Sequence, residues 1–459
     1  MDVQKLYSAF LECGKVTTDS RAISGGEMFF GLKGDNFDGN EYALKALEAG
    51  ARYSVVDESS MAATSGDPSV LVVPDTLVAL QALARHHREN TFIDGKRLTV
   101  IGLTGTNGKT TTKELITRVL SVKYKVTSTQ GNLNNDIGVP LSVLNINSQT
   151  QLAVIEMGAN HPDDIEKLVK VCEPDYGLIT NVGKAHLLGF GSFEGVKKAK
   201  GKLYDYISEH GGSIFLNADD KNLVAMAAER KGLNVIEYGI EHWGAMVLPS
   251  DAQHPFVRMA IPVSVAEPVE AKESTENLLC LETHLAGAYN ANNIAAAIAV
   301  GLHFGVSLED AVQAVSEYIP KNNRSQLEKT ERNILIEDAY NANPTSMAAA
   351  LENLATVQAP LKAAMLGDMR ELGTESVAEH IAILKKLASM NLDLVCLVGE
   401  EFRKALEEVT EPVEETSNAK WFPTSDDLVA WLKENQVSDH TILIKGSRGI
   451  RMEKILPEL

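Results

Sequence analysis

The residue types that hold phosphate occur together in one segment of the chain: Gly105, Thr106, Asn107, Gly108, Lys109, Thr110 and Thr111. An apolar stretch typical of a strand, Leu98 to Leu103, precedes this segment, and apolar residues at helical spacing follow it. Glycines let backbone N–H groups close around phosphate oxygens, the lysine adds a positive charge, and a threonine hydroxyl can coordinate Mg²⁺. The segment therefore predicts a loop that binds the phosphates of ATP.

This loop departs from the common phosphate-binding pattern at one position. A strict GxxxxGK[ST] pattern needs glycine at position 103, where this chain has leucine. An ordinary glycine turn between a strand and a helix is the alternative, but the Gly-Lys-Thr context favours phosphate binding. Kinases, motor ATPases, GTPases and ligases all use such loops, so other residues must decide the reaction.

Two further side chains are candidates for a metal site beside the loop. Glu156 ends the predicted strand from Leu152, and His186 follows the predicted strand Gly177 to Val182. Parallel strands bring their carboxyl ends to one edge of a sheet, where open α/β folds bind ligands and where oxygen donors suit Mg²⁺. The alternative is that neither residue binds a metal, because an acid at the end of a strand is often simply solvated and a single histidine often only packs against its neighbours.

The elements that position these residues alternate between strand and helix patterns in three runs. A polar stretch from Arg88 to Arg97 and a loop around Pro320 to Ser325 separate the runs, so we predict domains at 1–96, 97–319 and 320–459. Prolines and short apolar alternations between 243 and 282 indicate β-rich decoration of the second domain. In the third we expect strands at 334–338, 363–367, 394–399 and 441–445, and helices at 344–357, 375–390 and 425–434, which together predict a doubly wound sheet.

Length and composition bound the class of protein. A chain of 459 residues exceeds the size of one hydrophobic core, and its 44% apolar and 23% charged residues are typical of a folded globular protein. Because 43 Lys and Arg oppose 62 Asp and Glu, the net charge of −19 repels a phosphate backbone, and we expect no nucleic-acid partner. The four separated cysteines argue against a zinc site or a disulfide framework. With no signal peptide and no apolar run of about 18 residues, we expect a cytoplasmic protein without membrane insertion.

A series of longer motifs keeps one order and spacing along nearly the whole chain. They are Thr18-Asp19-Ser20-Arg21, Phe37-Asp38-Gly39, the phosphate loop, Gly131-Asn132-Leu133-Asn134-Asn135, Gly138-Val139-Pro140, Glu156-Met157-Gly158-Ala159, Ala185-His186-Leu187, Ala199-Lys200-Gly201, Gly287 with Asn290 and Asn293, Asp338-Ala339-Tyr340-Asn341-Ala342-Asn343-Pro344, Gly367-Asp368-Met369 and Lys445-Gly446-Ser447-Arg448. In these motifs the chain resembles the Mur ligases. The Tyr-Asn-Ala-Asn-Pro and Gly-Asp-Met segments resemble the family member that acts last.

The resemblance implies a role for individual residues. Lys109 and Thr110 would serve ATP and Mg²⁺, with Glu156 and His186 as further metal ligands. Lys200, in a lysine-rich segment whose spacing alone predicts a solvated helix face, would carry a CO₂-derived carbamate that faces the metal. Asn290 and Asn293 would face adenine, while Arg324 and Asp338 would reach the γ-phosphate and the ribose. The expected substrate-binding residues are Ser20, Arg21, Thr129, Asn134, Asn135, Asn341 and Asn343, the first two at uridine diphosphate.

The resemblance also implies an architecture and an activity. The expected α/β domains are an N-terminal nucleotide-sugar-binding domain, a central P-loop domain with a parallel sheet, and a C-terminal Rossmann-like domain. The expected reaction is ATP-dependent ligation of D-alanyl-D-alanine to UDP-MurNAc-tripeptide through an acyl phosphate, in peptidoglycan precursor synthesis. We expect a monomer, although the sequence leaves the oligomeric state open. It also leaves open the third residue of the tripeptide, carbamylation of Lys200, and whether the domains are open or closed.

Two alternatives and two departures accompany this expectation. A folylpolyglutamate synthetase has a similar phosphate loop but should lack the Asp-Ser-Arg and Tyr-Asn-Ala-Asn-Pro segments. A nucleotide-binding scaffold without chemistry would not need Lys109, Glu156 and Lys200 intact. Relatives often have histidine where this chain has Asn40 and an acid where it has Lys202; the first position concerns nucleotide-sugar binding and the second the surroundings of Lys200.

Overall fold

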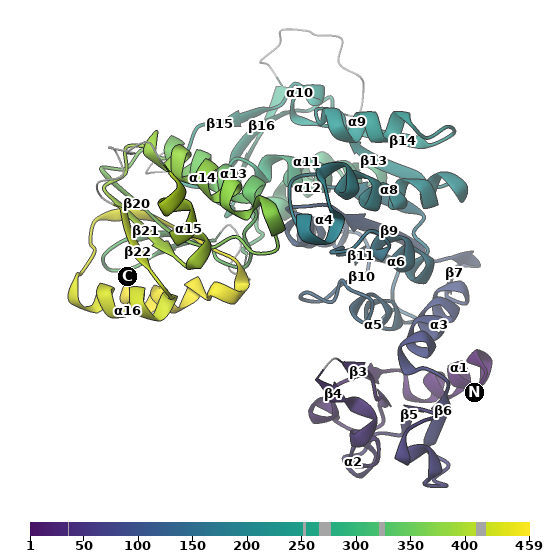
Figure 1. Cartoon of the computed structure of the whole chain (residues 1–459). Coiled ribbons are helices and arrows are strands. Elements are labelled where there is room, and N and C mark those ends of the chain that lie inside the picture. The colour runs from purple at the N-terminus through teal and green to yellow at the C-terminus, as the bar shows by residue number, and fades with distance from the viewer. Residues whose placement is uncertain (35, 251–253, 266–276, 321–325, 410–418) are drawn as a thin grey trace.

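The chain forms three bodies, each built on its own sheet, in a computed structural model that describes residues 1–34, 36–250, 254–265, 277–320, 326–409 and 419–459. Figure 1 shows the N-terminal body in purple, the central body in teal and the C-terminal body in green and yellow. The N-terminal and C-terminal bodies contact different parts of the central body. The predicted three-part α/β fold is confirmed, while its exact boundaries remain predictions.

The N-terminal body has a small parallel sheet in the order β1-β2-β5-β6. Its strands are β1 (Val16–Thr17), β2 (Met28–Phe30), β5 (Tyr53–Asp57) and β6 (Val70–Val73), and a hairpin of β3 (Lys33–Gly34) and β4 (Phe37–Asp38) lies beside them. The helices are α1 (Val3–Cys13), α2 (Ala43–Glu48) and α3 (Thr76–Glu89). Asp2 caps the start of α1, and Gly14 ends it with φ 67°, a left-handed conformation that favours glycine.

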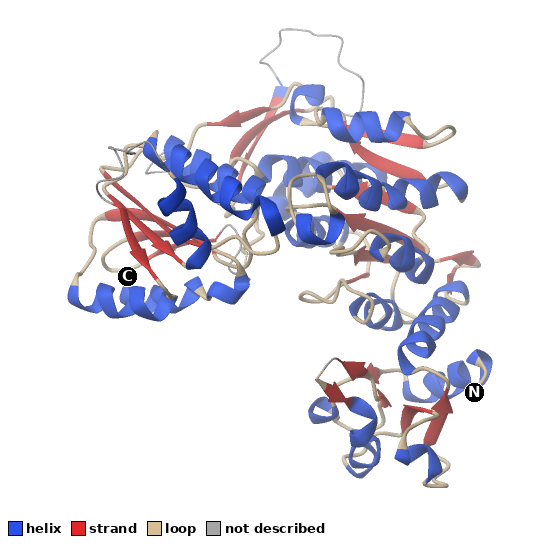
Figure 2. Cartoon of the chain, in the orientation of Figure 1, coloured by secondary structure: helices blue, strands red, loops and turns tan. Residues whose placement is uncertain are grey.

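The central body has six parallel strands in the order β10-β11-β9-β12-β13-β14, with helices on both faces (Figure 2). Neighbouring residues of a strand face opposite sides, so Val100 packs with α6 and α8 and Ile101 packs with α4 and α11. Strands that are buried on both faces must be apolar throughout, which explains the continuous apolar run before the phosphate loop. The strands are β9 (Thr99–Thr104), β10 (Val126–Ser128), β11 (Leu152–Glu156), β12 (Tyr176–Ile179), β13 (Ser213–Asn217) and β14 (Asn234–Tyr238). The helices are α4 (Lys109–Leu120), α5 (Gly138–Leu144), α6 (Asp164–Cys172), α7 (Leu187–Phe190), α8 (Phe193–Glu209), α9 (Lys221–Ala228), α10 (Ile240–Trp243), α11 (Asn290–His303) and α12 (Leu308–Ser316).

The β-rich decoration predicted between 243 and 282 is present in the described residues as an antiparallel sheet of β15 (Met246–Leu248), β16 (Arg258–Pro262) and β17 (Leu278–Glu282). Met259 and Leu281 from this sheet join the same apolar core as α11 and α12. The sheet therefore belongs to the central body. It lies on the side of that body away from the N-terminal body (Figure 1).

The C-terminal body is a second open sheet, in the order β18-β19-β23-β20-β21-β22, with only β18 antiparallel. Its strands are β18 (Gln326–Lys329), β19 (Ile334–Asp338), β20 (Leu361–Gly367), β21 (Leu394–Val398), β22 (Ala419–Phe422) and β23 (His440–Lys445). Its helices are α13 (Pro344–Thr356), α14 (Ser376–Ala388), α15 (Glu400–Glu408) and α16 (Ser425–Glu434). Asn343 and Thr424 form capping boxes at the starts of α13 and α16, which fixes where these helices begin.

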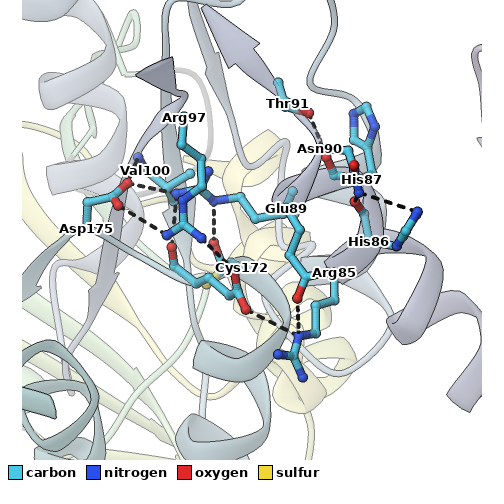
Figure 3. A network of polar contacts seen from close by, with 12 residues as sticks. Arg85, His86, His87, Glu89, Asn90, Thr91, Arg97, Val100, Cys172 and Asp175 are labelled. Atoms are coloured by element: carbon cyan, nitrogen blue, oxygen red, sulfur yellow. Dashed lines mark hydrogen bonds and ion pairs between the residues drawn. The ribbon is translucent and has the colours of Figure 1, made fainter. Parts of the chain in front are cut away.

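The N-terminal and central bodies share one apolar core, which runs from α1 through α3 to α5, α6 and α8. At its edge the fully buried Arg88 donates to Cys172 O (3.1 Å), Glu173 O (3.1 Å) and Asp175 Oδ2 (2.8 Å). Arg97 of the hairpin β7 (Phe92–Ile93) and β8 (Lys96–Arg97) pairs with the carboxylates of Glu173 (2.9 Å) and Asp175 (3.3 Å), and Figure 3 shows Arg97 beside Asp175. The polar stretch 88–97, predicted to separate the first two domains, is therefore a packed joint.

Replacing Arg88 tests this joint. Arg88→Met leaves two buried carbonyls without a donor and removes one partner of Asp175, so we expect unfolding to become easier by about 2–4 kcal/mol. Arg97→Met is the matched control, because that arginine is 39% exposed and an exposed ion pair contributes only about 0–1 kcal/mol. Urea denaturation of both variants checks the difference, and equal losses would contradict a buried joint.

Candidate active site

The phosphate loop joins β9 to α4 through two glycines at positions where any side chain would be strained. Gly105 and Gly108 have φ of 151° and 78°, in the region that favours glycine. A side chain at Gly105 would lie 1.9 Å from Thr180 Oγ1, and one at Gly108 would lie 2.5 Å from Asn293 Oδ1. The Lys109 amine folds back over the loop and donates to Gly105 O (2.9 Å).

The loop after β12 holds the phosphate loop from one side. Asn181 accepts from the backbone N–H of Thr106 through its carbonyl (3.0 Å) and from that of Asn107 through its Oδ1 (2.9 Å). Thr180 Oγ1 donates to Asn107 O (2.6 Å). The strand predicted to extend to Val182 ends at Ile179, because the following residues turn to make these contacts.

Glu156 is fully buried at the carboxyl end of β11. Its Oε1 accepts from Thr110 Oγ1 (3.2 Å) and from Asn134 Nδ2 (2.7 Å). Its Oε2 is buried and has no hydrogen-bond partner among the described residues. A buried carboxylate oxygen without a donor suits a hard cation, so Thr110 and Glu156 fit the predicted Mg²⁺ site.

Lys113, which the sequence-based reasoning missed, supports this arrangement from below. Its side chain is fully buried, and its Nζ donates to Thr129 O at 2.6 Å. Thr129 Oγ1 accepts from Glu156 N (3.0 Å), so α4 fixes the ends of β10 and β11 together. The sequence feature that could have indicated its role is its spacing, because a lysine four residues after Lys109 lies on the same face of the helix.

His186 and Lys200 lie near this centre but make different contacts. His186 lines the cleft, and its Nδ1 contacts the carboxylate of Glu371 from the C-terminal body. Within the described part of the chain no group of three or more His, Cys, Asp and Glu side chains is placed to hold a metal. The role of His186 as a metal ligand therefore stays a prediction.

Lys200 is on α8 with only 2% of its surface exposed, contrary to what its lysine-rich segment alone predicts. Its Nζ lies 5.9 Å from the centre of the Phe190 ring, and no described residue gives it an ion pair. Burial, and then the charge of Lys109, lower the pKa of Lys200 well below its usual value. A neutral amine at this position can react with CO₂.

Asn290 and Asn293 lie at the start of α11 on the other side of the phosphate loop. Asn293 Nδ2 donates to Asn290 Oδ1 (2.8 Å), and Asn293 Oδ1 accepts from Thr112 Oγ1 (3.1 Å). Both residues are buried and line the cleft. Their contact with adenine stays a prediction.

The C-terminal body forms the opposite wall of the cleft. Asp338, at the end of β19, accepts from Lys445 Nζ at 2.5 Å, and Lys445 also donates to Asn341 O (3.0 Å). Asn343 reaches across and donates from Nδ2 to Asn107 Oδ1 of the phosphate loop (2.7 Å). Arg324, expected at the γ-phosphate, lies outside the described residues.

The predicted substrate residues lie in three places. Asn134, Asn135, Asn341 and Asn343 line the cleft. Thr129 is buried beneath it, and Ser20 and Arg21 follow β1 in the N-terminal body, where the exposed Arg21 pairs with Asp19 at 2.8 Å.

Asn40, one of the two departures from the family pattern, is a buried structural residue. Its Nδ2 donates to Asp57 Oδ2 (3.0 Å), and its Oδ1 accepts from Asp57 N (2.8 Å). Lys202, the other departure, lies 3.3 Å from Glu166 in an ion pair. Asn40 therefore holds the end of β5 in place.

The cleft between the two bodies has a volume of about 1270 Å³ and carries many polar groups. Seven carboxylates (Asp136, Glu156, Asp164, Asp219, Asp220, Asp338 and Glu371) and five basic side chains (Lys109, Lys167, Lys221, Lys445 and Arg448) line it among the described residues. An anionic ligand must therefore be bound by individual positive groups, because the lining of the cleft as a whole is not positively charged. None of the helices described here is long and apolar enough to cross a membrane.

Three family models match the chain. They are the Mur ligase middle domain at residues 103–301, the Mur ligase glutamate ligase domain at 323–448, and the Mur ligase family catalytic domain at 13–101. The UDP-N-acetylmuramoyl-tripeptide--D-alanyl-D-alanine ligase of Bacillus subtilis is 33% identical over 97% of this chain and 92% of its own length. The protein of that name from Escherichia coli is 32% identical over 99% and 95%.

Solved structures agree with these matches. A crystal structure of MurF from Acinetobacter baumannii superposes with a TM-score of 0.83 at 30% identity, covering 100% of this chain and 98% of its own. MurF ligase from Thermotoga maritima in complex with ADP superposes with a TM-score of 0.78 at 25% identity, covering 98% and 97%.

Replacing Lys113 tests the support beneath Glu156. In Lys113→Met the buried carbonyl of Thr129 loses its donor, so we expect a loss of about 1–3 kcal/mol in unfolding free energy. We also expect faster hydrogen–deuterium exchange of the amides in residues 129–135. The exposed Lys198→Met is the control, and exchange in 129–135 that matches this control would contradict the role of Lys113.

Proposed function

The chain belongs to the Mur ligase family, and from this premise we propose that it joins D-alanyl-D-alanine to UDP-MurNAc-tripeptide with the conversion of ATP to ADP and phosphate. The observation that carries the proposal is the contact of Asn343 with Asn107. It brings the Tyr-Asn-Ala-Asn-Pro segment, which resembles the last-acting ligase, directly onto the phosphate loop. The group activated at the loop and the incoming amine can then meet in one cleft.

The phosphate loop supports ATP as the energy source. Its backbone N–H groups and the Lys109 amine supply local positive charge in a chain of net charge −19, where the overall field repels anions. Thr110 and Glu156 would hold Mg²⁺, which neutralises phosphate charge when bound. The excess of carboxylates along the cleft makes such a counter-charge necessary.

The proposed reaction has two steps at this loop. A carboxylate oxygen of the tripeptide attacks the γ-phosphorus of ATP, the bond from this phosphorus to the ADP oxygen breaks, and an acyl phosphate forms. The neutral amine of D-alanyl-D-alanine then attacks the acyl carbon, phosphate leaves with its oxygen, and the new amide nitrogen loses a proton. Lys109 holds the transferred phosphate, and Asn134 and Asn135 orient the acceptor, so positioning contributes more than a strong base.

Protection of the acyl phosphate from water requires the cleft to close. The N-terminal body shares a large apolar core with the central body, whereas among the described residues only Ala286 of the central body joins the apolar core of the C-terminal body, and polar pairs such as Lys184 with Glu379 (2.6 Å) link the two. Small polar interfaces permit movement between domains. We propose that the C-terminal body moves to admit and release the substrates.

A substrate panel tests the proposed reaction. ATP, UDP-MurNAc-tripeptide and D-alanyl-D-alanine together should give UDP-MurNAc-pentapeptide, seen by mass, and ADP release should require both co-substrates. Lys109→Ala should lower kcat by about 10²–10³-fold, because a charge aimed at the transferred phosphate is lost. Lys198→Met should leave kcat unchanged, and pentapeptide formed at the normal rate by Lys109→Ala would refute the role of the loop.

The burial of the Lys200 amine, which lowers its pKa, leads us to propose that it reacts with CO₂ and presents a carbamate to the metal. Lys200→Ala should lose at least about 10²-fold in kcat, and a short carboxylic acid such as acetate should restore part of the activity. The same acid should not rescue Lys109→Ala. Failure of every short carboxylic acid to restore Lys200→Ala would count against the carbamate.

A further inference from the structure

We propose that Arg448, stacked on Tyr340 at the C-terminal wall of the cleft, binds the terminal carboxylate of the incoming dipeptide. This inference rests on the proposed ligase function and adds to it a residue that selects the amine substrate.

The backbone beneath Arg448 is fixed by the buried Ser447. Ser447 N donates to Asp368 O (3.1 Å), and Ser447 Oγ accepts from Arg370 N (2.9 Å). A side chain at Gly446 would lie 3.0 Å from the Cα of Gly367, so β23 and β20 end in close contact just before the arginine. The Arg448 side chain thus projects from a rigid base although it is itself exposed.

Tyr340 orients the guanidinium group. The guanidinium carbon of Arg448 lies 5.4 Å from the centre of the Tyr340 ring, and its Nη1 lies 3.5 Å from the Tyr340 hydroxyl oxygen. Both residues line the cleft. Stacking on an aromatic face leaves the edge of the guanidinium plane available for a ligand.

Arg448 is the basic residue of this wall that lacks a carboxylate partner among the described residues. The other, Lys445, is 1% exposed and pairs with Asp338 at 2.5 Å. No ion pair joins Arg448 to an acid of the described chain, even though Asp338 and Glu371 line the same wall. An always-charged group that faces a cleft without a counter-ion suits an anionic ligand.

The dipeptide provides that anion. Its amine must be neutral and face the acyl phosphate, while its carboxylate, at the other end, loses hydration when it enters the cleft. The planar guanidinium fork matches a carboxylate with two parallel hydrogen bonds, which a lysine ammonium cannot do. Binding the carboxylate at Arg448 would leave the amine directed away from this anchor, toward the phosphate loop that Asn343 contacts.

The test compares D-alanyl-D-alanine with its C-terminal amide in wild type, Arg448→Met and Arg448→Lys. Wild type should prefer the free acid by about 10- to 100-fold in kcat/KM, because a charged hydrogen-bond pair is lost with the amide. Arg448→Met should raise the KM for the dipeptide by a similar factor, treat acid and amide alike, and keep the KM for ATP. Arg448→Lys should fall between the two.

Arg451→Met is the matched control, because Arg451 is an exposed arginine of the same loop that does not line the cleft. It should keep the wild-type preference for the acid. Preserved preference in Arg448→Met, or a raised KM for ATP in place of the dipeptide KM, would overturn the proposal. If Arg448→Met does not fold, a wild type that uses acid and amide equally would overturn it without any variant. A wild type that uses no dipeptide at all would instead refute the ligase function.

Discussion

The carboxylate of Glu156 receives hydrogen bonds from Thr110, in the helix of the phosphate loop, and from Asn134, in the segment after β10. Its backbone N–H is held by Thr129, which Lys113 in turn fixes to the same helix. The phosphate loop, the proposed metal position and the proposed acceptor segment are therefore coupled through one buried acid. Its second oxygen has no donor in the described chain, and a bound cation would meet this need.

The two outer bodies attach to this centre by different kinds of contact. A shared apolar core and the buried Arg88 hold the N-terminal body, so the distance from Ser20 and Arg21 to the phosphate loop is built into the fold. The C-terminal body contributes Asn343, Glu371 and Glu379 to polar pairs across the cleft. Contacts of this kind can break and re-form as substrates enter and products leave.

The sequence predicted well those features that depend on local pattern. Strands 334–338 and 441–445 and helices 344–357 and 425–434 were expected within one residue of their observed ends, because apolar periodicity and capping residues lie in the segments themselves. It did not predict α15, β22 or the packed joint at 88–97. The joint depends on partners distant in the chain, as Arg88 does on Cys172 and Asp175. For the same reason local pattern predicted a solvated helix face around Lys200 and did not single out Lys113, although both lysines are buried.

Transfer of oxygen from the acceptor to phosphate tests the central claim, that the loop and the buried acid activate a carboxylate by phosphorylation. The tripeptide substrate would carry ¹⁸O in its terminal carboxylate, and the phosphate released during ligation would be examined by ³¹P NMR. If the carboxylate attacks ATP, the released phosphate contains a labelled oxygen from the tripeptide. Phosphate without label, formed together with the pentapeptide product, would contradict the account.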